Sequence, residues 1–261
     1  MDLRREAECA RDLVAEAGKA AKSMQRGVRR RDKGGGLGPV TEADLACERL
    51  ILEGLRRAFP DDAIVSEETL NGGVPGGARR VWCVDPIDGT REYADGLPEY
   101  ACMIGLLVDG APCAGALSLP ADGTHFWGWG GGGVFQDGAQ VSLPRTTDLS
   151  KAVAIHSRSH QGPQLREALR RLAPLRTIPA GSIGYKVGWL LSGRAHIYIH
   201  PRGGTMWWDS AGPAALVLAG GGFAGDASGA PLRYEGELDH PKGLLFCGPG
   251  LADAAVARLR G

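Results

Sequence analysis

This sequence of 261 residues lacks several features that mark particular classes of protein. Lysine and arginine number 30 and aspartate and glutamate also number 30, so the formal net charge is zero. A protein that binds nucleic acid polymers or membrane surfaces without specificity carries a basic excess, so the charge argues against both roles. No apolar run approaches the roughly 20 residues that a membrane-spanning helix needs, and we expect no membrane insertion.

The six cysteines form no C-x-x-C pair. Several lie in apolar stretches, which favours free thiols packed as small hydrophobic side chains. Free thiols are typical of a reducing compartment. The charged N-terminal stretch MDLRREAEC lacks the apolar core of a secretory signal. Together these absences favour a cytoplasmic protein.

Glycine, by contrast, is abundant, with 41 residues. Its clusters separate periodic segments and therefore indicate turns and loops rather than low complexity. None of the clusters is followed by Lys-Ser or Lys-Thr, so the sequence holds no Walker-type phosphate loop.

The first half of the chain combines two helices with several strands. Apolar residues at three- and four-residue steps predict a helix from residue 2 to about 26. A second helix begins after Thr41, where T-E-A-D matches a capping box completed by Asp44, and stops before Pro60. Strands follow, with a hairpin-like turn at 108–110; we expect them at 63–66, 81–85, 102–108, 114–119 and 124–129.

The second half alternates strands and helices. Strands are predicted at 152–156, 195–199, near 232 and at 244–247, and helices at 161–172, 182–191 and 208–219. This order predicts an α+β half followed by an α/β half. We expect an N-terminal domain of residues 1–147, which carries most of the candidate metal ligands, and a C-terminal domain of residues 148–261.

Acidic residues follow the apolar runs of this pattern. Glu67 and Glu68 end one predicted strand, Asp85 ends the next with Asp88 close behind, and Asp209 opens a helix. Carboxylates brought together at strand ends repel one another and need a cation, and oxygen ligands favour Mg²⁺, Mn²⁺ or Ca²⁺. Each acid also has a simpler explanation, because Asp88 fits a turn and Asp209 fits a helix N-cap.

Gly89 and Thr90 add a second element to this candidate site. If a helix or turn opens there, their backbone N–H groups favour an anion. Carboxylates for a metal beside N–H donors for an anion indicate a phosphate ester bridged by Mg²⁺. No residue resembles a covalent nucleophile, since Cys83 lies in an apolar strand that disfavours a thiolate. The pattern therefore favours hydrolysis by direct attack of water.

The segments DPIDGTREY, VSEE, PVTEAD and WWDSAGPAALVLAGG together resemble the inositol monophosphatase superfamily of Mg²⁺-dependent, lithium-inhibited phosphatases. The resemblance implies a layered αβαβα sugar-phosphatase fold. It also implies a small-molecule phosphate ester as substrate, two to three Mg²⁺ ions, Mn²⁺ as a substitute, and inhibition by Li⁺ and Ca²⁺. Members of this family are often dimeric, so a homodimer is an expectation of the resemblance.

The resemblance assigns roles at the matching positions. The metal ligands would be Glu67, Asp85, the Ile87 carbonyl, Asp88 and Asp209. Asp44 and Thr90 would orient and deprotonate the attacking water beside Glu67, with the capping role of Asp44 less favoured, and Glu68 would assist through water. Asp88 and the amides of Gly89 and Thr90 would bind the phosphate.

The flanking residues distinguish branches of this family. Inositol-type members typically continue D-G-T with Thr-Asn-Phe and carry a glutamate seven residues before the last aspartate, whereas this chain has Arg91-Glu92-Tyr93 and Arg202. An arginine cannot accept hydrogen bonds from a polyol but suits a second anionic group. GSIGYK and YIHPRGG resemble the CysQ branch of 3′(2′),5′-bisphosphate nucleotidases, which implies substrate contacts for Ser182, Lys186, Arg202 and Asp209.

Alternatives to this assignment stay open at the level of sequence. Ser182 fits an N-cap, Lys186 an exposed position on an amphipathic helix, and Arg202 a surface loop. The substrate could instead be inositol phosphate, fructose bisphosphate or histidinol phosphate, and the fold could serve a non-catalytic metal- or nucleotide-binding regulator. The GGGLG insert at 34–38 puts a catalytic role of Lys33 in question.

Overall fold

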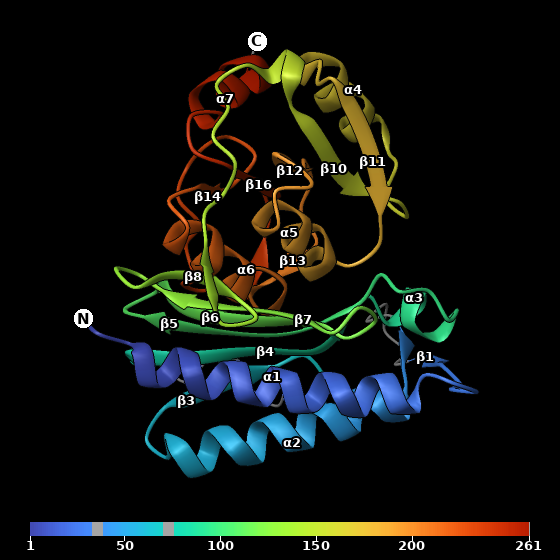
Figure 1. Ribbon diagram of the computed structural model, residues 1–261, viewed down its shortest axis with the longest axis vertical. Coiled ribbons are helices and arrows are strands. Elements are labelled where there is room, and N and C mark those ends of the chain that lie inside the picture. Colours follow the sequence, from blue (N-terminus) through green and yellow to red (C-terminus); the bar gives the residue numbers. More distant parts are fainter. Residues whose placement is uncertain (33–38, 70–75, 261) are drawn as a thin grey trace.

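The computed structural model describes residues 1–32, 39–69 and 76–260, and its elements stack in five layers of helix, sheet, helix, sheet and helix (Figure 1). The layered αβαβα fold expected from the sequence is confirmed. Lys33 and its glycine-rich insert lie outside the described residues. Within the described chain, every helix is too short or too polar to cross a lipid bilayer.

Two amphipathic helices form the first layer, α1 (Arg4–Met24) and α2 (Glu42–Ala58). The buried face of α1 consists mainly of small residues at helical spacing, Ala7, Ala10, Val14, Ala17 and Ala21. These small side chains let α1 lie close to the neighbouring sheet, which it contacts along β6 and β7. The predicted bounds of both helices are confirmed to within a few residues.

The second layer is a seven-stranded sheet in the order β3-β4-β5-β6-β7-β8-β9. Only β3 and β4 are parallel, and the other neighbours are antiparallel. The sheet is covered on both faces, so all eight residues of β5 are buried. The strands are β3 (Ala63–Ser66), β4 (Arg80–Asp88), β5 (Ala101–Val108), β6 (Ala111–Leu119), β7 (Thr124–Trp129), β8 (Gly133–Gln136) and β9 (Ala139–Val141).

The middle layer consists of α5 (Ile183–Leu191) and α6 (Trp207–Ala219), which lie between the two sheets (Figure 1). Helix α6 crosses the seven-stranded sheet where three glycines meet. A Cβ added to Gly105 would lie 2.3 Å from the amide nitrogen of Gly212, and one added to Gly115 would lie 2.7 Å from its carbonyl oxygen. Glycine is required at this crossing, which sets the height of α6 and of Asp209 in its first turn.

The fourth layer is a five-stranded sheet in the order β11-β10-β12-β16-β14, and α4 and α7 cover its outer face. Its strands are β10 (Val153–Ser157), β11 (Arg176–Ala180), β12 (Ile197–His200), β14 (Phe223–Gly225) and β16 (Leu244–Cys247). The helices are α4 (Pro163–Leu172) and α7 (Ala252–Arg260). The smaller elements are α3 (Thr90–Ala94), a 3₁₀ turn (Leu149–Lys151), and the pairs β1 (Arg31–Asp32) with β2 (Pro39–Val40) and β13 (Thr205–Met206) with β15 (Asp239–His240).

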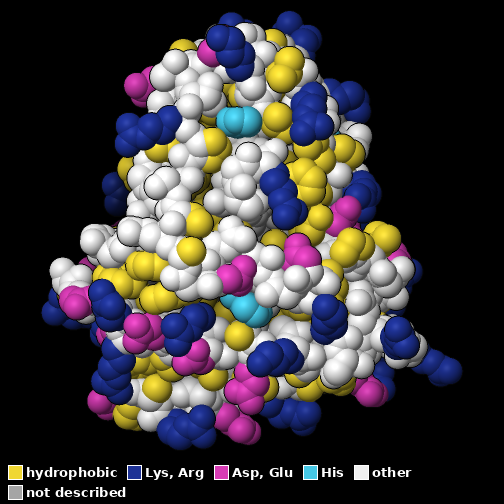
Figure 2. All heavy atoms as spheres, viewed as in Figure 1, with side chains coloured by type: hydrophobic (Ala, Val, Ile, Leu, Met, Phe, Trp, Pro, Cys, Tyr) yellow, Lys and Arg dark blue, Asp and Glu magenta, His cyan; other side chains and the backbone are white. Residues whose placement is uncertain are grey.

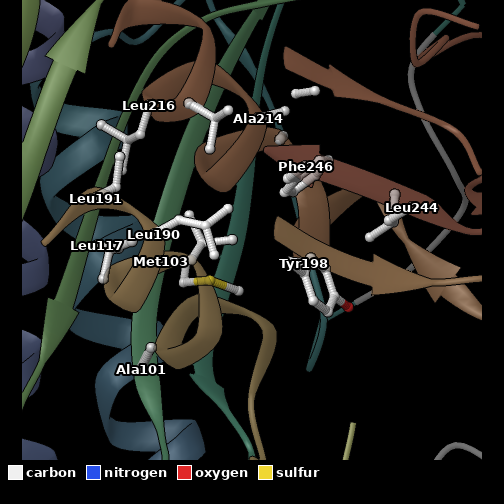
Figure 3. Packing of buried hydrophobic residues seen from close by; sticks show 14 of the residues in the cluster. Ala101, Met103, Leu117, Leu190, Leu191, Tyr198, Ala214, Leu216, Leu244 and Phe246 are labelled. Atoms are coloured by element: carbon white, nitrogen blue, oxygen red, sulfur yellow. The ribbon is translucent and has the colours of Figure 1, made fainter. Parts of the chain in front are cut away.

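One hydrophobic core joins the two halves of the chain. Figure 3 shows Met103 and Leu117 of the seven-stranded sheet beside Leu190 of α5, with Leu216 of α6 and Phe246 of the five-stranded sheet in the same cluster. The division at residues 147 and 148 therefore separates the two sheets but runs through a shared core. The domain boundary stays a prediction.

Some elements differ from those predicted. The strand expected near residue 232 is wrong: Pro231 makes only an isolated bridge to Gly225, and Leu232 lies in a loop. Proline has no N–H to donate to a sheet, which limits pairing at this point. The sequence also gave no signal for β11, an edge strand with Pro179 and mostly exposed or half-buried residues.

On the face that Figure 2 shows, lysine and arginine side chains are interspersed with acidic ones. This surface agrees with the formal charge balance of the chain. A continuous basic stripe, which would suit a nucleic acid polymer, does not stand out on this face.

Candidate active site

Three aspartates from both halves of the chain converge between the sheets. Asp85 and Asp88 lie at the end of β4, and Asp209 lies in the first turn of α6. One carboxylate oxygen from each lies within 4.8 Å of the other two. The sequence prediction that these acids come together is therefore matched by their placement.

A register shift explains why Asp85 and Asp88 face the same side. Cys83 belongs to the core between the sheets and Ile87 to the core under α1 and α2. Regular alternation would turn Asp88 away from Asp85, but the pairing with β5 shifts between the two residues. Pro86, which lacks an N–H, lies within this irregularity and accommodates it. The shift returns Asp88 to the side of Asp85.

The electrostatics of the cluster fit a divalent cation. Asp85 is 1% exposed, and its Oδ1 atom has no hydrogen-bond partner in the described part of the chain. Burial, followed by the charges of Glu67, Asp88 and Asp209, raises the pKa of Asp85 well above its ordinary value. Burial and Asp88 likewise raise the pKa of Asp209. A bound Mg²⁺ ion would supply the missing positive charge to these oxygen ligands.

Glu67 lies beside this cluster because β3 runs parallel to β4, with Ser66 opposite Val84. The Glu67 amide donates to the Val84 carbonyl, and Glu67 lines the same cavity as Asp88 and Asp209. Glu67 therefore borders the cluster, although the group of described acids whose oxygens lie within 4.8 Å of one another consists of Asp85, Asp88 and Asp209. Its role as a ligand, like those of the three aspartates and the Ile87 carbonyl, stays a prediction.

Asp88 is held from the opposite half of the chain. Its Oδ2 atom accepts hydrogen bonds from the Ser182 hydroxyl at 2.6 Å and from the Gly184 amide at 2.7 Å. Ser182 also caps α5 by accepting from the Tyr185 amide at 3.0 Å. Ser182 is thus both an N-cap and a partner of Asp88, while its contact with substrate stays a prediction.

Asp44 serves two neighbours at once. Its Oδ2 atom accepts from the Thr41 amide at 2.8 Å and from the Thr41 hydroxyl, which completes the capping box of α2. Its Oδ1 atom lies 3.1 Å from the Thr90 hydroxyl, which is also 3.1 Å from the Ile87 carbonyl. The expectation that a catalytic role makes the capping role less favoured is wrong, because each carboxylate oxygen has its own partners. Burial raises the pKa of Asp44.

Gly89 precedes α3 in a left-handed conformation, with φ of 89°. A Cβ at this position would lie 2.8 Å from the Glu99 carbonyl oxygen. Only glycine fits here without strain, and the turn carries the Gly89 and Thr90 amides to the cavity that both residues line. Their binding of phosphate stays a prediction.

A cavity of about 260 Å³ opens over the acids and is lined from both halves of the chain. Lys186 lines it but is only 2% exposed, so the alternative of an exposed helix position is wrong. Its Nζ atom donates to the carbonyls of Ser182 at 2.6 Å and Gly181 at 3.0 Å. Burial lowers the pKa of Lys186 to about 8. Arg202 is exposed and also lines the cavity.

Two histidines, absent from the sequence prediction, line the far wall of this cavity. The rings of His160 and His200 meet edge to face at 6.0 Å, and Ser157 hydrogen-bonds His160 at 3.1 Å. Burial lowers the pKa of His200 to about 4, so its ring is neutral near pH 7. His200 lies within the YIHPRGG segment, where the prediction assigned a role only to Arg202, and no spacing or motif in the sequence marks His160.

Glu48 on α2 was also missed. Its Oε1 atom accepts from the amides of Glu68 at 3.2 Å and Thr69 at 3.1 Å, and from the hydroxyls of Ser66 and Thr69. These bonds hold the Ser66 side chain before Glu67 and the backbone directly after it. The available signal was a carboxylate one helical turn after Asp44, on the otherwise apolar face of α2.

Comparison with known proteins gives consistent findings. The profile of the inositol monophosphatase family matches residues 2–260. The chain is 33% identical over 198 residues to the 3′(2′),5′-bisphosphate nucleotidase CysQ of Shigella flexneri, covering 75% of this chain and 79% of that protein. It is also 33% identical over 206 residues to the histidinol-phosphatase of Chlorobaculum parvum, covering 76% of each.

Among solved structures, the inositol monophosphatase from Anabaena (Nostoc) sp. PCC 7120 is similar, with a TM-score of 0.83 and 24% sequence identity. The match covers 100% of this chain and 97% of that one. At this level of sequence identity, the similarity shows a shared fold and nothing about the reaction.

Proposed function

Because this chain belongs to the inositol monophosphatase family, we propose that it is a Mg²⁺-dependent phosphomonoesterase that removes the 3′-phosphate of 3′-phosphoadenosine 5′-phosphate. The observation that carries the proposal is the cluster of Asp85, Asp88 and Asp209, in which Asp85 is buried and the other two are half-buried. One Asp85 oxygen has no hydrogen-bond partner among the described residues, and the adjoining cavity is lined by the basic side chains Arg91, Lys186 and Arg202. The similarity to CysQ of Shigella flexneri supports the choice of a nucleotide bisphosphate.

Glu67, Asp85, the Ile87 carbonyl, Asp88 and Asp209 would hold the metal. When bound, Mg²⁺ would neutralise the phosphate, lower the pKa of water and stabilise the leaving 3′-oxygen. Among the described residues that line the cavity, we assign none as a covalent nucleophile. Water is therefore the attacking group.

Thr90 and Asp44 would position this water and move its proton. The Thr90 hydroxyl carries one proton, which it can donate either to Asp44 Oδ1 or to the Ile87 carbonyl, both at 3.1 Å. If the Ile87 carbonyl faces a cation, Asp44 becomes the acceptor. Water would donate to Thr90 Oγ1 while Thr90 donates to Asp44, whose raised pKa favours uptake of a proton.

The phosphate would lie against the amides of Gly89 and Thr90, next to Asp88. Arg202 at the cavity wall would bind the second phosphate, which a bidentate guanidinium suits. Lys186 would contribute positive charge beneath the backbone at 180–182, and Ser182 would hold Asp88 in place. Glu68 would assist through water.

A second candidate is histidinol-phosphate hydrolysis, which the likeness to the Chlorobaculum parvum enzyme supports. Its substrate has a single phosphate and would leave Arg202 without an anionic partner. Inositol 1-phosphate and fructose bisphosphate are two further candidate substrates.

A substrate panel tests the proposal. Phosphate release from these four compounds is measured with Mg²⁺, with EDTA and with Li⁺. We expect the highest kcat/KM for 3′-phosphoadenosine 5′-phosphate, loss of activity in EDTA and inhibition by Li⁺. Arg202→Ala should lower kcat/KM for this bisphosphate by roughly tenfold or more, and for histidinol phosphate by much less. A preference for inositol 1-phosphate or histidinol phosphate would refute the proposal.

The proposed enzyme would use two to three Mg²⁺ ions, accept Mn²⁺ in their place and be inhibited by Ca²⁺. It would be a cytoplasmic homodimer acting in sulfur metabolism. Activity with Mn²⁺ and sedimentation of the purified protein test the metal and dimer parts directly.

A further inference from the structure

Four carboxylates line the described part of the cavity, and three of them, Glu67, Asp88 and Asp209, belong to the proposed metal set. The fourth is Glu92, on α3 one helical turn after Asp88. Its side chain is half-buried, and among the described residues no other residue donates a hydrogen bond to its carboxylate. Glu92 is therefore an acceptor on the cavity wall that the metal chemistry leaves unused.

The contact between Glu92 and Gly181 locates this acceptor. A Cβ at Gly181 would lie 2.4 Å from Glu92 Cδ and 2.6 Å from its Oε1 atom, so the carboxylate lies directly against the glycine backbone. The next residue, Ser182, donates to Asp88 at 2.6 Å. Glu92 thus contacts the residue directly before Ser182, whose hydroxyl hydrogen-bonds Asp88 of the proposed metal site. A ligand group that reaches Glu92 belongs to the part of the substrate beside the scissile ester.

The surroundings of Glu92 indicate which kind of group is missing. Burial and the charges of Asp88 and Glu99 raise its pKa, while a hydrogen bond from its own backbone amide and the charge of Lys186 lower it. The Lys186 ammonium already hydrogen-bonds the backbone carbonyls of residues 180–182. A positive charge is therefore close by, and what Glu92 lacks among the described residues is a hydrogen-bond donor beyond its own amide. A half-buried carboxylate with unused acceptor capacity gains from a further hydrogen bond, so a ligand donor is favoured here.

We propose that Glu92 accepts a hydrogen bond from the hydroxyl on the carbon next to the phosphorylated carbon, and so selects substrates that carry this vicinal hydroxyl. The inference rests on the proposed function, under which this group is the ribose 2′-hydroxyl. A hydroxyl on the neighbouring carbon stays close to the ester oxygen whatever the rest of the substrate is. Its bond to a carboxylate is charge-assisted and therefore among the stronger hydrogen bonds.

The test compares adenosine 3′,5′-bisphosphate with its 2′-deoxy analogue in the wild-type enzyme, Glu92→Ala and Glu92→Gln. We expect the wild type to favour the ribose substrate about tenfold to a hundredfold in kcat/KM, as for a hydrogen bond to a charged group. Glu92→Ala should bring this ratio close to one by slowing the ribose substrate alone. Glu92→Gln, which keeps an acceptor oxygen, should give an intermediate ratio.

Glu53→Ala, at an exposed position on α2, is the matched control and should leave the ratio unchanged. A ratio in Glu92→Ala equal to that of the wild type would overturn the inference. A shift in the Mg²⁺ concentration needed for half-maximal activity, at an unchanged ratio, would also overturn it and assign Glu92 to the metal site. Melting temperatures of the variants exclude a folding defect.

The same assays distinguish a wrong proposed function from a wrong role for Glu92. If the wild type hydrolyses neither nucleotide but does hydrolyse inositol 1-phosphate, the nucleotide assignment is wrong. The same variants are then compared on inositol 1-phosphate and its 2-deoxy analogue, where the expected ratios are the same.

Discussion

Replacing Asp85 by asparagine should stabilise the metal-free protein. Asp85 is 1% exposed and faces the charges of Glu67, Asp88 and Asp209, and its Oδ1 atom has no hydrogen-bond partner among the residues that the structure describes. Because its pKa is raised in the native state, the unfolded chain releases the proton first as pH rises above the ordinary value of 3.8. Stability therefore falls with rising pH, by about 1.4 kcal/mol per pH unit, until the native pKa is reached.

The magnitude follows from the length of the chain. For 261 residues, about 1.4 kcal/mol corresponds to roughly 2–3 °C in Tm. Asparagine has the same shape, carries no charge and can donate to the neighbouring carboxylates. In EDTA at pH 7.5 we expect Asp85→Asn to melt about 3–6 °C above the wild type, and this gap should shrink as pH is lowered to 5.

Mg²⁺ should reverse the order of the two melting temperatures, so that the wild type melts above Asp85→Asn. Binding to the native state alone adds about 2.7 kcal/mol at a hundredfold excess over Kd, which is roughly 5 °C in Tm. The wild type should gain this amount, whereas Asp85→Asn should gain little and should lose activity. Differential scanning fluorimetry with EDTA or Mg²⁺ at several pH values measures both effects, with the exposed Asp61→Asn as control. A metal-free variant that melts below the wild type, or equal Mg²⁺ responses, would refute the reasoning.

Three further substitutions test other parts of the site. Glu48→Ala removes the acceptor for the backbone amides that follow Glu67, so it should lower the unfolding free energy by about 1–3 kcal/mol and raise the Mg²⁺ concentration needed for half-maximal activity. Glu48→Gln keeps an acceptor oxygen and should retain most of the stability and most of the Mg²⁺ affinity. Chemical denaturation and a Mg²⁺ titration measure the two effects. Asp44→Asn should lower kcat by about 10²–10⁴ because it removes the proton acceptor of Thr90, and an unchanged kcat would contradict that role. Gly89→Ala forces a Cβ to 2.8 Å from a carbonyl oxygen and should lower unfolding free energy by about 1–3 kcal/mol, a loss that thermal melting would reveal.

The sequence predicted the elements with a strong pattern most closely. The apolar run Ala63–Ser66, ended by two glutamates, coincides with β3, and the capping box of Thr41 and Asp44 begins α2 as expected. In both cases the signal is local, since a turn, a cap or an acid marks the end of a short periodic segment. Strand β11 had no such signal because an edge strand need not bury either face.

The site depended on features that a single stretch of sequence does not contain. Asp88 faces Asp85 only because β4 shifts its register against β5, and strand alternation alone predicts the opposite side. An amphipathic helix over residues 182–191 would leave Lys186 exposed, which is the alternative that the sequence left open. Helix α5 lies between two sheets, so both of its faces are covered and a lysine there is buried.

The division of the metal site between the two halves has a consequence for the order of folding during synthesis. Asp85 and Asp88 leave the ribosome well before Ser182, Gly184 and Asp209, which hold or complete their cluster. Until α5 and α6 pack onto the sheet, the nascent chain carries carboxylates without the partners that assemble them. At the proposed metal site, full Mg²⁺ affinity should thus arise only in the last stage of folding, and the ion would then bind the finished chain selectively.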